Sequence, residues 1–121
     1  MKRIYDPPEP ADGYRLLIDR LWPPGISRQR AALAGWQREL APSTALRQWF
    51  HSDPRRWRQF AARYRAELRA RAAELAALRR RARHERVTLL YAARDAQLNH
   101  ARVLAEVLRR PRAARPGRRP R

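Results

Sequence analysis

Two pairs of charged residues follow apolar runs at distant places in the chain. One run ends on Asp19 and Arg20, and a second run, far downstream, ends on Arg94 and Asp95. A carboxylate can orient a ligand hydroxyl or transfer a proton, and a guanidinium can bind a phosphate or a carboxylate. The pattern therefore predicts a site for a small anionic ligand, with Asp19 and Asp95 as candidate catalytic residues.

The two apolar runs predict where these pairs lie. Residues 14–19 and 87–93 are continuously apolar at their centres, which is typical of strands covered on both faces. Open α/β sheets bind ligands outside the carboxyl ends of their strands. If the two strands are neighbours, both pairs converge at one rim of the sheet. The amino terminus of the helix that follows would also favour an anion there.

Further side chains are predicted at or beside this rim. His100 lies early in the last helix and is the third candidate catalytic residue. The candidate ligand-binding residues are Tyr5, Arg15, Arg20, Trp22, Tyr91, Arg94 and Asn99. These residues identify no particular reaction, so binding without catalysis stays open as an alternative.

Each of these residues also has a purely structural interpretation. Asp95 suits the N-cap of the last helix, and Arg20 and Arg94 suit ion pairs with the carboxylates beside them. The four tryptophans are more typical of a core than of a base-stacking surface. The two interpretations differ in one consequence. Replacing Asp19 and Arg20 by alanine leaves stability nearly unchanged if they bind a ligand, and lowers it strongly if they form a structural network.

The apolar pattern predicts a single α/β domain over residues 1–108, with a small, mostly parallel three-stranded sheet flanked by helices. The predicted strands are 3–5, 14–19 and 87–93. Helices are predicted from Ser27 to Pro42, from Ser43 over a short span, from Asp53 to about Arg83 with a break near 69–73, and from Asp95 to Leu108. The predicted order is therefore β-β-α-α-α-β-α.

The chain is strongly basic, with a formal net charge of +18. Residues 109–121 contain seven arginines and no bulky apolar residue, so we predict a disordered basic tail. The remaining residues, 1–108, keep +11, an excess that favours polyanions. The alternative function is therefore a noncatalytic nucleic-acid-associated protein that uses the tail and an arginine-rich helix face. That face includes Arg79, Arg80, Arg81 and Arg83.

Several kinds of site are excluded or not predicted. The chain has no cysteine, which excludes thiol catalysis, disulfides and thiolate metal sites. Its three histidines lack metal-ligand spacing and its few glycines form no phosphate loop, so we predict neither a metal nor a cofactor. No apolar leader or membrane-length run is present, and we expect a cytoplasmic bacterial protein without membrane contact. A homodimer that buries the tryptophan-rich helices is compatible with either function.

Four segments together resemble a known family. RIYDPPEPADGYRLLIDRLWPPGIS, LAPSTALRQWF, DPRRWRQFAARYRAEL and VTLLYAARDAQLNHARVLAEVL, in this order, are similar to the YeaO-like family of bacterial proteins, a DUF488 family. The resemblance covers residues 3–108 and implies a small cytoplasmic α/β protein with no established activity. Two positions depart from the family pattern. Pro24 replaces the arginine of its usual W-P-R-G segment, and Ser52 stands where a histidine usually precedes D-P.

Overall fold

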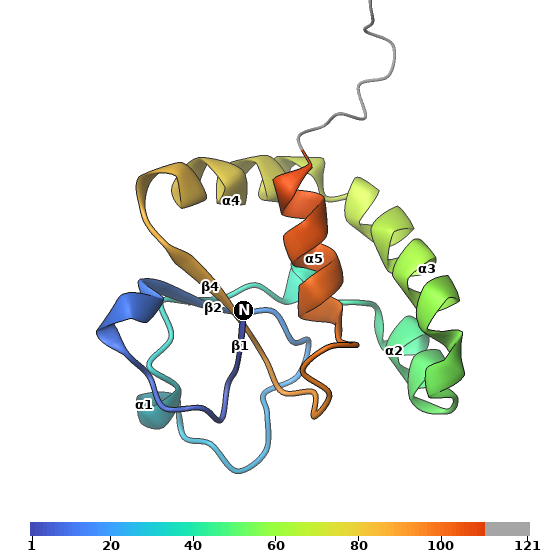
Figure 1. The fold of residues 1–121 in the computed structure, drawn as a ribbon, viewed down its shortest axis with the longest axis horizontal. Coiled ribbons are helices and arrows are strands. Elements are labelled where there is room, and N and C mark those ends of the chain that lie inside the picture. Colours follow the sequence, from blue (N-terminus) through green and yellow to red (C-terminus); the bar gives the residue numbers. More distant parts are fainter. Residues whose placement is uncertain (111–121) are drawn as a thin grey trace, which may run out of the picture.

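Four parallel strands form one sheet in the computed structural model, which describes residues 1–110 (Figure 1). The strands are β1 (Lys2–Arg3), β2 (Tyr14–Leu17), β3 (Gly35–Trp36) and β4 (Val87–Tyr91), in the spatial order β1-β4-β2-β3. The central strands β2 and β4 are parallel neighbours, with Tyr14 opposite Val87 and Leu17 opposite Leu90. The α/β class and the parallel sheet are thus confirmed.

The prediction of three strands is wrong, because β3 lies inside a segment that was expected to be helical. Ser27 does cap a helix, but this helix, α1 (Arg28–Ala31), ends after one turn at Ala32, which adopts a left-handed conformation. The chain then pairs with β2, where the amide of Gln37 donates to the Leu17 carbonyl. The observed order is β1-β2-α1-β3-α2-α3-α4-β4-α5.

The middle helices follow the predicted caps and the predicted break. Ser43 caps α2 (Thr44–His51), and Asp53 caps a short 3₁₀ turn (Pro54–Arg56) that leads into α3 (Trp57–Arg69). A separate helix, α4 (Ala72–His84), follows. The chain therefore breaks where its apolar face is reduced to alanine. Helix α5 lies between α3 and α4 in Figure 1 and contacts both of them.

The last helix, α5 (His100–Arg109), begins later than predicted. Its N-cap is Asn99, whose side chain accepts from the Arg102 amide. The predicted N-cap role of Asp95 is wrong, because its carboxylate accepts from the amides of Gln97 and Leu98 in the preceding loop. Arg109, predicted to be in the tail, belongs to this helix, and residues 111–121 of the predicted tail lie outside the described residues.

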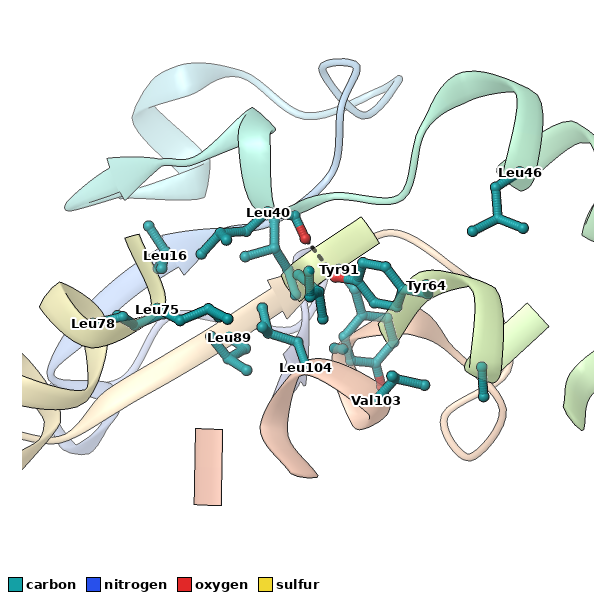
Figure 2. Close-up of a cluster of buried hydrophobic side chains, with 14 of the residues drawn as sticks. Leu16, Leu40, Leu46, Tyr64, Leu75, Leu78, Leu89, Tyr91, Val103 and Leu104 are labelled. Carbon is teal, nitrogen blue, oxygen red and sulfur yellow. Dashed lines mark hydrogen bonds between the residues drawn. The ribbon is translucent and has the colours of Figure 1, made fainter. Parts of the chain in front are cut away.

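Hydrophobic side chains cover both faces of the sheet. Leu16 and Leu89 face the larger cluster, beneath the helices α2 to α5, whereas Leu17 and Leu90 face a smaller cluster on the other side. Figure 2 shows the larger cluster. All four tryptophans lie only partly buried at the margins of these clusters. No helix within residues 1–110 has the length and hydropathy needed to span a membrane.

Candidate functional site

An aspartate and a histidine meet at the carboxyl ends of the central strands. Asp19 comes two residues after β2, and His100 is the first residue of α5. The His100 Nε2 atom lies 2.9 Å from Asp19 Oδ1 and 3.0 Å from the Ile18 carbonyl oxygen. The other carboxylate oxygen of Asp19 accepts from the Ala92 amide at 3.0 Å. Asp19 therefore joins the ends of β2 and β4 to the start of α5.

The surroundings of Asp19 and His100 determine which ring nitrogen of His100 donates a hydrogen bond. Each of the two side chains is 14% exposed, so little water reaches them. Both neighbours of His100 Nε2 are acceptors, so Nε2 carries a proton and Nδ1 is the atom left to accept one. A carboxylate that orients an imidazole in this way is one component of a general base. Two of the three candidate catalytic residues are thus brought together.

Tyr64 of α3 lies beside the Asp19–His100 pair, although the sequence predicts only that it packs in the core. Its ring meets the His100 ring edge-on, with centroids 6.3 Å apart. Its hydroxyl donates to the Leu40 carbonyl, as Figure 2 shows. Burial raises the pKa of Tyr64, so the phenol stays neutral. Its regular spacing with Phe60 and Leu68 indicates core packing and gives no signal of a contact with His100.

Arg20 lies at the rim but is bound to the backbone. Its Nε donates to the Pro42 carbonyl at 3.1 Å and its Nη2 to the Ala41 carbonyl at 3.0 Å. Arg3, which the sequence did not single out, makes the same kind of contact with the carbonyls of Ala93 and Ala92. These guanidiniums hold the connections that follow the strands, and the predicted ion pair between Arg20 and Asp19 is not formed.

Arg15 lies away from the carboxyl rim, in the amino-terminal half of β2. It is 5% exposed, and its Nη1 binds Asp12 Oδ2 at 2.5 Å. Its Nη2 donates to the Ala31 carbonyl at 2.8 Å. Asp12 also binds Lys2. Arg15 is therefore part of a buried polar network and is not placed to bind a ligand at the rim.

The loop after β4 separates Arg94 and Asp95 from Asp19 and Arg20. Both loop residues are exposed, and within residues 1–110 no hydrogen bond or ion pair joins either of them to the first pair or to each other. Hydrogen bonds from the amides of Leu98 and Gln97 lower the pKa of Asp95. Asn99, 2% exposed, donates to the Asp95 carbonyl at 2.9 Å. In this loop, Arg94 is the cation that remains accessible.

Two of the three remaining predicted rim residues are each anchored by a single hydrogen bond. The Tyr5 hydroxyl donates to the Pro24 carbonyl at 2.7 Å, and the Trp22 indole donates to the Ile26 carbonyl at 2.8 Å. Tyr91 packs in the larger core cluster, and burial raises its pKa. No cluster of three or more potential metal-ligating side chains exists within residues 1–110.

The arginines proposed as a nucleic-acid surface divide into two groups. Arg79 donates to the carbonyls of Val107 and Leu108 at the end of α5, at 2.9 and 3.1 Å. Arg81 binds Glu85 at 2.8 Å and its guanidinium lies 4.0 Å from the Tyr14 ring centroid. Arg80 and Arg83 are exposed and have no side-chain hydrogen bond or ion pair within the described part of the chain. Within residues 1–110, this second group has no polar partner that a polyanion would have to displace.

Comparison with known proteins assigns the chain to a family. The family model described as the inactive DUF488-N3 subclade matches residues 1–119. The chain belongs to the DUF488 family. The uncharacterized protein YeaO of Escherichia coli K12 is 46% identical over 108 residues, which is 89% of this chain and 94% of YeaO. The predicted YeaO-like resemblance is therefore confirmed.

Two mycobacterial proteins are also similar to the chain. The uncharacterized proteins Mb3100c of Mycobacterium bovis and Rv3073c of Mycobacterium tuberculosis are each 42% identical over 106 residues. The alignment covers 88% of this chain and 89% of each relative. No solved structure matches the chain.

Proposed function

We propose that this DUF488 protein is a noncatalytic nucleic-acid-associated protein that binds phosphate backbones through exposed arginines of α3 and α4. The observation that carries the proposal is the charge imbalance of the described domain. The chain carries +18, and residues 111–121 contain five arginines and no acid, which leaves +13 for residues 1–110. An excess of this size binds polyanions by releasing their condensed counterions.

Two pairs of arginines, one on α3 and one on α4, are together called the basic helix surface: Arg58, Arg69, Arg80 and Arg83. Arg58 and Arg69 are eleven residues apart in α3 and therefore share one face, as do Arg80 and Arg83 in α4. All four are exposed, and none has an acidic partner within residues 1–110. A solvated helix face normally mixes charges of both signs, so two arginine pairs without acidic partners favour a role in binding.

Two observations favour binding without catalysis. The matching family model is described as an inactive subclade. At the strand ends, Asp19 is bound to His100 and to the Ala92 amide, and Arg20 is bound to two carbonyls. The two carbonyls occupy the Arg20 guanidinium, so an anionic substrate would have to displace them.

The test compares two double variants of the full chain that lose equal charge. Arg80→Gln with Arg83→Gln removes half of the basic helix surface, and Arg30→Gln with Arg47→Gln removes two exposed arginines elsewhere. Binding to a labelled duplex is measured by fluorescence anisotropy across a salt series. Each lost phosphate contact should lower the salt slope by about 0.9, so the first variant should lose about 1.8. Equal losses in both variants, or no binding by the unmodified chain, would refute the proposal.

A second candidate function is the binding of a small anionic ligand at the strand carboxyl ends. It is favoured by the little-exposed pair of Asp19 and His100 at this rim, because His100 shares the segment after β4 with the exposed Arg94. A thermal-shift screen of inorganic phosphate, nucleotides and sugar phosphates tests it. A ligand at a hundredfold over its dissociation constant should add about 2.7 kcal/mol of stability. Arg94→Gln should abolish the shift and Arg47→Gln should not; a shift that survives Arg94→Gln contradicts this placement.

A further inference from the structure

Two tryptophans are held against each other where β2 and β3 end. Trp36 is the last residue of the edge strand β3, and Trp22 lies in the loop that follows β2. Their ring centroids are 5.4 Å apart, in an edge-to-face arrangement. The Trp36 indole donates to the Asp19 carbonyl at 2.7 Å, and the Trp22 indole donates to Ile26. Both rings are therefore fixed in place while they remain partly exposed.

Two exposed arginines border these rings. The Arg28 guanidinium lies 4.7 Å from the Trp22 ring centroid, and that of Arg38 lies 4.0 Å from the Trp36 ring centroid. Neither side chain has a hydrogen bond or an ion pair within residues 1–110. We call Trp22, Trp36, Arg28 and Arg38 the indole–guanidinium platform. It presents aromatic surface and positive charge together at one end of the sheet.

This combination matches the chemistry of an unpaired nucleotide. Bases stack on indole rings and on guanidinium planes, while guanidiniums also bind the phosphates between them. In a duplex the base faces are covered by their neighbours, so only a single strand can use the rings. Leu21, next to Trp22 and 63% exposed, adds apolar surface beside the platform.

We propose that the indole–guanidinium platform stacks bases of single-stranded nucleic acid. The inference rests on the proposed nucleic-acid function and adds a preference for unpaired strands. The basic helix surface attracts single-stranded and double-stranded nucleic acid alike, whereas the platform favours single strands. Trp49, which stacks with Arg63 at 4.4 Å, is a useful comparison because it lies on α2 and packs against the larger core cluster.

The first test is a pair of double variants in the full chain. Arg28→Gln with Arg38→Gln should weaken binding to a labelled oligothymidylate by about tenfold and change duplex binding much less. Arg47→Gln with Arg63→Gln removes the same charge, including one guanidinium stacked on an indole, and should weaken both ligands alike. Thermal unfolding of each variant checks that the fold is kept.

The second test measures the fluorescence of Trp22 and Trp36. Trp49→Phe with Trp57→Phe leaves Trp22 and Trp36 as the tryptophan fluorophores, and oligothymidylate should quench their emission at saturation. Binding of single strand and duplex with equal affinity, or saturation without quenching, would overturn the platform while leaving the proposed function intact. Failure of the unmodified chain to bind either ligand would overturn both.

Discussion

The Arg79 guanidinium of α4 donates to the Leu108 carbonyl at the end of α5, 3.1 Å away. Its Nη2 also reaches the Val107 carbonyl at 2.9 Å. The last carbonyls of a helix have no partner within the helix, and a cation placed there also complements the helix dipole. Arg3, Arg15 and Arg20 each hold backbone carbonyls in a similar way. Part of the unusual arginine content is therefore structural.

Replacing Arg79 by alanine should destabilise the protein by about 2 kcal/mol, because charged hydrogen bonds to two carbonyls are lost. Arg79→Lys keeps the charge but lacks the planar set of guanidinium N–H donors, so it should restore only part of the lost stability. Arg80→Ala, on the exposed neighbour, should change stability by less than about 0.5 kcal/mol. Urea unfolding gives all three values. Equal stability of the Arg79 and Arg80 variants would show that the contact contributes nothing.

Replacing Asp19 by alanine should lower stability by about 2 kcal/mol, because the Ala92 amide and His100 Nε2 both lose an acceptor in a little-exposed site. Asp19→Asn still offers an acceptor to the Ala92 amide and should lose less. Asp6→Ala removes an exposed carboxylate and serves as the control. An unchanged melting temperature for Asp19→Ala would instead favour a residue reserved for a ligand.

Asp12 should make the protein sensitive to acid. Burial alone would raise the pKa of Asp12, but hydrogen bonds from the Glu9 amide, Lys2 and Arg15 lower it from 3.8 to about 2. Because the folded-state pKa is depressed, the carboxylate stabilises the fold above about pH 4, and this contribution disappears as the pH falls towards 2. Unfolding free energies measured across this window should decline less in Asp12→Asn than in the unmodified chain. The exposed control Glu39→Gln should keep the original decline.

Two glycines with positive φ should differ in their tolerance of a side chain. Gly13 has φ +67°, and an added Cβ would lie 2.4 Å from the Arg86 carbonyl oxygen. Gly25 has φ +79° and no atom within 4 Å of that position. Gly25→Ala should cost about 1 kcal/mol from backbone strain alone. Gly13→Ala should cost about 3 kcal/mol, because the collision adds to the strain. Similar melting temperatures for the two variants would contradict the close approach.

Long apolar runs made the central sheet predictable from the sequence. Residues 14–19 and 87–93 could only be buried, and their parallel pairing places Asp19 near His100. The strand at Gly35 and Trp36 could not be foreseen, because a two-residue edge strand leaves no periodicity and the flanking residues suit a helix. The start of α5 was misplaced because Asp95 and Asn99 are both good caps, and the backbone turn after Asp95 decides between them. The partners of Arg20 are backbone carbonyls, which no side-chain pattern marks.

Both edge strands of the sheet, β1 and β3, are only two residues long. A short edge strand leaves few free backbone N–H and C=O groups with which a strand of a second molecule could pair. Two copies that associate would therefore have to meet through side chains, on surfaces that carry strong mutual repulsion. Self-association should become easier when salt or a bound polyanion screens that repulsion. We therefore expect two copies to stay apart at low salt unless a polyanion lies between them.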